Sequence, residues 1–179
     1  MNKQRSQLWK SVVSRLMDEY KTLSMSELEW IDRRLNRIDI VQRELDQLFR
    51  TAEGESICHR CQGDCCAKGH NHMTLANLLS FARHDVFPPD ADFDRTCPFL
   101  SSSGCELSVI SRPYNCITFI CDSIEQAFGE EDKQRFYDLD RELRSLYLEF
   151  SQRYQGGAMT GLLIQEDRCP GQPLLNLKK

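Results

Sequence analysis

The sequence has no uninterrupted apolar stretch that approaches the roughly 20 residues a helix needs to cross a bilayer. Its first residues also show no apolar run followed by a small-residue cleavage site, the arrangement that marks a secretory signal. We therefore expect a cytoplasmic protein that does not enter a membrane. Thiols stay reduced in the cytoplasm, so a cysteine cluster there is more often a metal site than a disulfide framework.

Common signatures of enzymes are also absent. The sequence contains no G-x-G-x-x-G, no phosphate-binding loop, no G-x-S-x-G and no H-E-x-x-H. Residues 51–122 hold nine acidic and only five basic side chains, without the basic stripe of a nucleic-acid binder. The flanks balance in charge, so this segment alone accounts for the net charge of −4. We therefore expect no nucleic-acid partner.

The first part of the chain, residues 5–50, has the pattern of amphipathic helices. Apolar side chains recur at helical spacing, and neither glycine nor proline interrupts them. Either Ser24 or Ser26 ends the break after the first helix, and Ser26 with Glu29 matches a capping box, which predicts a long helix over about 26–50.

Residues 123–155 return to the helical pattern. A short helix is predicted from about Ser123 to Phe128, and a longer one follows the break at Gly129 and stops at Gly156-Gly157. Residues 156–179 are predicted to be an irregular tail, with disorder only over its last few residues.

The middle part, residues 51–122, contains eight of the nine cysteines and many glycines and prolines. Only Thr74 to about Arg83 keeps a helical pattern, with Thr74 as its cap, and the rest is predicted to be loops. A loop-rich piece of this size buries too little apolar surface to hold itself together. A metal centre is a usual remedy, because structural zinc contributes on the order of 10 kcal/mol.

The whole chain of 179 residues suits one mainly α-helical domain. Long amphipathic helices from both flanks would pack on a loop-rich cysteine metal-binding core. We favour the apolar stripes of the flanks as the core of the domain; the alternative is a homodimer interface.

The spacing of the cysteines predicts that they bind metal. Cys58 and Cys61 form C-x2-C, in which a tight turn aims two thiolates at one ion, and Cys65 and Cys66 follow closely. A thioredoxin-like redox pair would need a strand before this motif, and Ser56-Ile57 is too short for one. Proline or glycine then stands near most of the later cysteines, where turns present thiolates from loops. The later cysteines are Cys97, Cys105, Cys116 and Cys121.

The combined string C-x2-C-x3-C-C, CPFL, GC and RP-x2-C resembles the YkgJ-type cysteine cluster proteins, described as zinc- or iron-chelating domains. The resemblance covers roughly residues 55–122 and leaves the helical flanks unmatched. Many members have arginine directly after the cysteine of RP-x2-C, where this chain has Ile117. The resemblance implies metal ligands drawn from the seven cysteines of the string, with Cys121 as a plausible eighth. The seven are Cys58, Cys61, Cys65, Cys66, Cys97, Cys105 and Cys116.

Two kinds of metal centre suit such a set. A [4Fe–4S] cluster and a zinc ion each take four ligands, and eight cysteines suffice for two sites. The close spacing of three thiolates in C-x2-C-x3-C favours an iron–sulfur cluster, while scattered single cysteines would also suit zinc. His70 and His72 follow the cluster and could supply a ligand. We favour the alternative that they orient the loop or face water, because thiolates outcompete imidazole in cluster assembly.

Three functional hypotheses stay open at this point. The first is a metal-binding protein whose biological role the sequence does not specify. The second is an iron–sulfur-dependent redox or protein-modifying enzyme. The third is a zinc-braced helical scaffold, which exposed aromatics such as Trp30 and Tyr147 would favour, although aromatics at helical spacing are more often core.

Overall fold

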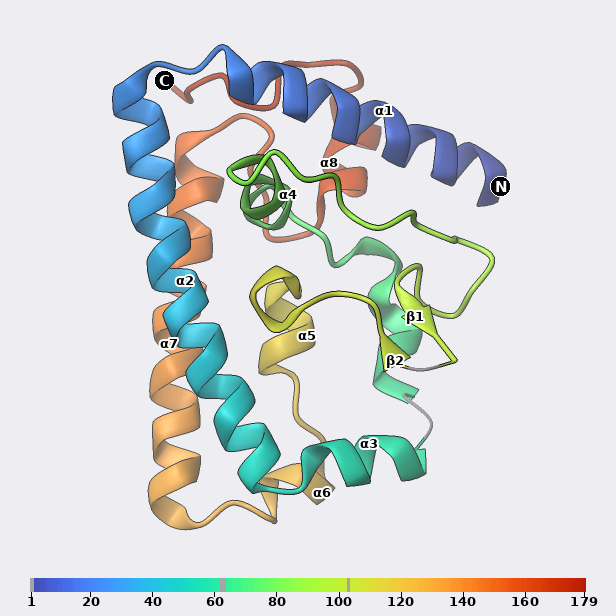
Figure 1. Cartoon of the computed structure of the whole chain (residues 1–179), viewed down its shortest axis with the longest axis vertical. Coiled ribbons are helices and arrows are strands. Elements are labelled where there is room, and N and C mark those ends of the chain that lie inside the picture. Colours follow the sequence, from blue (N-terminus) through green and yellow to red (C-terminus); the bar gives the residue numbers. More distant parts are fainter. Residues whose placement is uncertain (1, 62–63, 103) are drawn as a thin grey trace.

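The computed structural model describes residues 2–61, 64–102 and 104–179; within these ranges the side chains of His59, Cys61, Asp64, Cys65, Ala67 and Lys68 lie outside the description. Helices dominate the described residues, and the only sheet among them is one two-stranded hairpin (Figure 1). The mainly α-helical fold that the sequence predicts is confirmed.

The long helices are α1 (Asn2–Lys21), α2 (Met25–Thr51) and α7 (Glu130–Arg153). Between α2 and α7 lie the short elements of the cysteine-rich part, and α8 follows α7 near the C-terminus. The short elements are α3 (Gly54–Cys61), the 3-10 helix η1 (Asp64–Asn71), α4 (Leu75–Ala82), β1 (Leu100–Ser101), β2 (Gly104–Cys105), the 3-10 helix η2 (Val109–Ser111), α5 (Tyr114–Thr118), α6 (Asp122–Glu125) and α8 (Leu162–Arg168).

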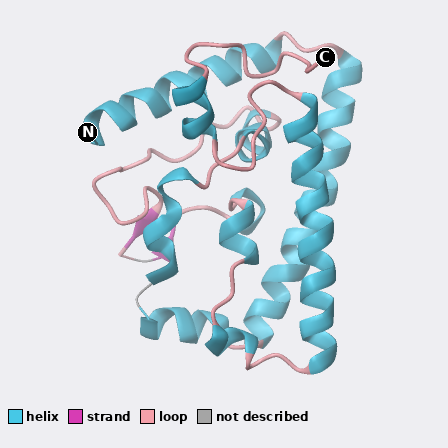
Figure 2. Cartoon of the chain, turned by 180° about the vertical axis from the view of Figure 1, so that it is seen from behind, coloured by secondary structure: helices cyan, strands magenta, loops and turns pink. Residues whose placement is uncertain are grey.

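The apolar stripes of the two flanks pack against each other inside one chain. Helices α2 and α7 run side by side, and α1 crosses one end of the molecule (Figures 1 and 2). Ile31 and Leu35 of α2 and Leu139 and Leu143 of α7 are almost completely buried. These residues belong to one continuous hydrophobic cluster, so the stripes form the core of the domain. We call α1, α2, α4, α7 and α8 the frame.

The long second helix begins earlier than the sequence predicts. Ser24, and not Ser26, is its N-cap, and the Glu27 backbone N–H donates to Ser24 Oγ at 3.3 Å. The Glu27 side chain also binds Arg153 and Tyr154 at the end of α7. This long-range contact accounts for the choice between two serines that both fit the local pattern.

The cysteine-rich part is neither mostly loop nor without a core, which corrects the sequence-based interpretation. Helix α4 carries Leu75, Leu78 and Leu79, each no more than 1 % exposed. Thr74 precedes this helix as predicted, and Asn77 Oδ1 accepts from the Thr74 backbone N–H at 3.0 Å. Helix α4 packs on α1, α2 and α7, so it belongs to the frame.

The other predicted boundaries in this region are closer to the structure. Gly129 is the N-cap of α7, which ends at Arg153, a few residues before the two glycines. Helix α6 spans only Asp122–Glu125 and so ends before Phe128.

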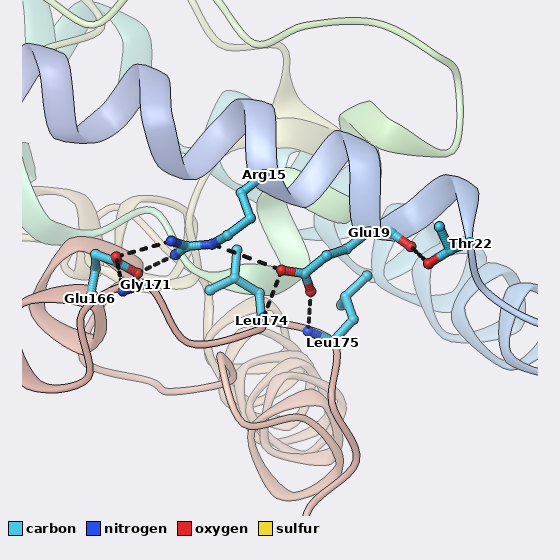
Figure 3. Close-up of polar contacts among 7 residues, drawn as sticks. All are labelled: Arg15, Glu19, Thr22, Glu166, Gly171, Leu174 and Leu175. Atoms are coloured by element: carbon cyan, nitrogen blue, oxygen red, sulfur yellow. Dashed lines mark hydrogen bonds and ion pairs between the residues drawn. The ribbon is translucent and has the colours of Figure 1, made fainter.

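The C-terminal tail is more ordered than the sequence predicts, because it contains α8 and is fixed to α1. Figure 3 shows the Glu19 carboxylate accepting the Leu174 and Leu175 backbone N–H groups, at 3.1 and 2.8 Å. Both leucine side chains are buried in the core. Arg15 lies between Glu19 and Glu166, and binds the Glu166 carboxylate of α8. The prediction of a disordered end is therefore wrong for residues 174 and 175.

Candidate cysteine metal centre

The first four cysteines lie on two consecutive short helices. Cys58 and Cys61 are on α3, and Cys65 and Cys66 are on η1. The C-x2-C motif therefore lies on a helix and not on the tight turn that the sequence predicts. The side chains of Cys61 and Cys65 lie outside the described residues.

Cys97 lies where η1 meets the hairpin. Its carbonyl accepts the Leu100 backbone N–H at 3.1 Å, and Leu100 pairs with Cys105 across β1 and β2. A Cβ atom at Gly69 of η1 would stand 2.6 Å from Cys97 Sγ, so the η1 backbone packs directly on this sulfur. Burial raises the pKa of the Cys97 thiol, and the nearby charge of Cys105 raises it further. Cys97, Cys105 and η1 therefore form one neighbourhood.

Cys116 lies against a histidine. It is on α5, and its Sγ is 3.3 Å from His72 Nδ1, although 44 residues separate the two in sequence. His72 is half-buried, and this burial lowers the pKa of its imidazole below the ordinary value. The structure thus brings His72 to a candidate ligand, which was the less favoured of the two roles considered for it from the sequence.

His70 has a different environment from His72. Its Nε2 lies 2.8 Å from the Arg95 carbonyl oxygen, and its ring meets Phe93 edge-on at 5.7 Å between centroids. These contacts join η1 to the loop that precedes Cys97. His70 therefore orients the loop, the role that the sequence predicts for it.

Cys121 comes at the start of α6, as its N-cap residue. Helix α6 contacts α3, so Cys121 belongs to the same end of the molecule as the helix that carries Cys58 (Figure 1). Cys169 lies elsewhere, in a surface pocket of about 230 Å³ formed by residues 155–178. Neither Cys97, Cys105, Cys121 nor Cys169 forms a disulfide.

The described side chains supply pairs of donors and not a complete site. Among them, no three of the His, Cys, Asp or Glu residues lie close enough together to hold one metal ion. Zinc and a [4Fe–4S] cluster each need four ligands. The donor chemistry fits both, since thiolates suit both centres and imidazole suits zinc. A full ligand set would need further donors, for which Cys61 and Cys65 are the unplaced candidates.

No family model, no curated protein and no solved structure matches the chain. Within the part of the chain that the structure describes, no helix combines the length and the apolar character that crossing a membrane requires.

Proposed function

We propose that this chain is a cytoplasmic metal-binding protein of the YkgJ type, in which clustered cysteine thiolates hold an iron–sulfur cluster or zinc. The contact between η1 and the Cys97 sulfur is the observation that carries the proposal. It joins the helix of Cys65 and Cys66 to a cysteine about 30 residues further along the chain. Local turns alone would not produce such a contact, which supports convergence of the sulfurs.

The other candidate-bearing elements add to this support. Helix α3 packs on α6, which links Cys58 to the element that Cys121 begins. Cys116 meets His72, which directly follows η1. The excess of acidic side chains in residues 51–122 gives this region a negative charge that a bound cation would offset.

The choice of metal follows from the ligands. The spacing of Cys58, Cys61 and Cys65 favours a [4Fe–4S] cluster, while the imidazole of His72 beside Cys116 favours zinc. Zinc would brace the short helices, whereas a cluster would also supply electron transfer. The residues of the chain would position the thiolates and partly cover them, as the burial of Cys97 illustrates.

The scaffold hypothesis loses its support from exposed aromatics. Tyr147 is 3 % exposed and donates no surface for a partner. Trp30 packs edge-on against Phe150 of α7, with 5.2 Å between ring centroids. Tyr147 therefore belongs to the core, and Trp30 is a partly buried residue that packs against the core, with Arg153 over its ring.

The proposal is tested by elemental analysis of protein purified without oxygen. A cluster would give brown protein containing iron and sulfide, and zinc would give colourless protein. Cys97→Ser, Cys61→Ser and Cys65→Ser should each lose metal. Cys169→Ser is the matched control, since Cys169 lies in a separate pocket, and it should keep its metal. Protein without stoichiometric metal, or cysteine variants that retain it fully, would contradict the proposal.

A further inference from the structure

We infer that His72 and Cys116 form a nitrogen–sulfur donor pair for a zinc ion, so that the metal centre includes a mixed cysteine–histidine site. This inference rests on the proposed function and names a ligand that the cysteine pattern does not contain. The contact joins a histidine to a candidate cysteine that lies 44 residues further along the chain.

The separation of the two atoms suits coordination of one ion. With a Zn–S bond of about 2.3 Å and a Zn–N bond of about 2.0 Å, a tetrahedral site places nitrogen and sulfur about 3.5 Å apart. His72 Nδ1 and Cys116 Sγ lie 3.3 Å apart. Entry of an ion between them would therefore need only a small outward movement of either side chain.

The frame fixes His72 from both sides along the chain. Before it, Asn71 Oδ1 accepts from Arg5 of α1 at 2.7 Å. Gly161, at φ +95°, approaches so closely that a Cβ atom there would stand 1.8 Å from the Asn71 carbonyl oxygen. After it, the Met73 carbonyl accepts the Leu162 backbone N–H of α8 at 2.7 Å. The position of the His72 backbone is thus set by α1 and α8.

The frame fixes Cys116 through the turn that precedes it. The Arg112 carbonyl accepts from Gln42 Nε2 of α2 at 2.7 Å and from Asn77 Nδ2 of α4 at 3.1 Å. Gln42 and Asn77 are both buried. The Cys116 backbone N–H then donates to the Pro113 carbonyl at 2.9 Å, which closes the first turn of α5.

The two donors are therefore brought together by buried contacts that involve no metal. Such preorganisation lowers the conformational cost of binding an ion, because the ligands do not have to be ordered at that moment. The arrangement points to a ligand role for His72.

The test uses the full-length protein loaded with zinc under anaerobic conditions and X-ray absorption at the zinc edge. Wild-type protein should show a Zn–N contribution at about 2.0–2.1 Å beside the Zn–S contribution. His72→Gln should lose the Zn–N contribution and bind zinc more than about 100-fold less tightly, since even outer-shell partners of ligands are worth about 10–100-fold. His70→Gln is the matched control and should retain both.

A second variant separates ligation from a structural role. His72→Cys supplies a different ligand atom, so it should retain zinc with sulfur coordination only. If His72 had only a structural role, the order of zinc affinity would be reversed: His72→Gln would keep its zinc, and His72→Cys would bind zinc less tightly. His72→Cys also keeps the test informative if His72→Gln does not fold, which circular dichroism will report.

The outcomes distinguish this inference from the proposed function. Wild-type protein that takes up no zinc and no iron would overturn both. Wild-type protein that takes up zinc with sulfur ligands alone, and a His72→Gln variant of unchanged affinity, would overturn the inference and leave the function standing. Iodoacetamide should also alkylate Cys116 more slowly in zinc-loaded than in metal-free protein. Equal rates would contradict the inference that Cys116 binds zinc.

Discussion

The C-terminal tail and the cysteine-rich part both lack long helices, yet different chemistry holds them. The tail is fixed to α1 by carboxylates, since Glu19 of α1 accepts two of its backbone N–H groups and Glu166 of α8 binds Arg15 of α1. In the cysteine-rich part, side-chain amides of α2 and α4 hold the turn before α5, while the Cys97 sulfur packs on η1 and the Cys116 sulfur lies against His72. Both regions are therefore attached to the frame by polar contacts, and the cysteine-rich part also carries the donors that a metal would join.

Helix α4 marks the boundary between the two kinds of region. It comes from the middle of the cysteine-rich part, but its side chains are buried among α1, α2 and α7. We therefore expect the frame, including α4, to fold without metal. Metal should add stability mainly to α3, η1, the hairpin, α5 and α6, and the following predictions examine this division.

The largest expected effect is on the core that α4 completes. Leu79→Ala removes a side chain that is 0 % exposed, so it should lower the free energy of unfolding by about 2–5 kcal/mol. Urea unfolding followed by far-ultraviolet circular dichroism measures this loss. Val86→Ala, at a site that is 51 % exposed, is the control and should change it by less than about 0.5 kcal/mol. A loss below about 1 kcal/mol for Leu79→Ala would exclude α4 from the frame.

The next effect concerns the attachment of the tail. Glu19→Ala leaves the backbone N–H groups of Leu174 and Leu175 without their acceptor, at about 1–3 kcal/mol for each buried group that stays unpaired. We expect a total loss of about 2–4 kcal/mol and faster hydrogen exchange at these two amides. Glu29→Ala, which removes an exposed carboxylate 3.9 Å from Arg33, is the control and should change little. Unchanged exchange in Glu19→Ala would show that burial alone holds the tail.

A smaller effect, which depends on pH, is expected where α2 meets α7. The hydrogen bond from Arg153 holds the pKa of Glu27 below its ordinary value, with a further contribution from Tyr154. A lowered folded-state pKa adds stability above the ordinary carboxyl pKa, and this stability is lost as the pH falls through the folded value. Glu27→Gln should thus cost about 1 kcal/mol near neutral pH and nothing in strong acid. A cost independent of pH would contradict this origin.

The smallest effect on the frame should come from removing the metal. A chelator should speed hydrogen exchange in η1 and α5 and leave the protected amides of α2 and α7 nearly unchanged. Mass spectrometry of peptic fragments measures both regions in one experiment. Cys169→Ser treated in the same way is the control and should match the wild type. Equal loss of protection in α2 would show that the frame also depends on metal.

Periodicity in the sequence was sufficient for the flanks because their helices are long and their apolar stripes are regular. It was sufficient for α4 too, since Thr74 caps an apolar run. It failed for α3 and α8, which are short and depend on contacts with α6 and α1. The polar backbone contacts that order Leu174 and Leu175 also come from a helix about 155 residues away, which no local pattern records.

The candidate site shows the same limit. The spacing of the cysteines is enough to name the candidate thiolate ligands, and a structure is not needed for that step. The approach of His72 to Cys116 spans 44 residues and depends on how α1, α2, α4 and α8 hold two separate turns. Residue type alone gives no reason to prefer His72 to His70, whereas the contacts of the two imidazoles differ.

The position of α4 has a consequence for how a metal would be captured. It divides the eight clustered cysteines into four before it and four after it, on two excursions of the chain that both return to the frame. Each excursion is tethered at both ends, which would limit the volume that its thiols explore and raise their effective concentration. An incoming ion would therefore find its ligands already held close together. Binding would need small movements of these side chains and not the folding of a disordered chain.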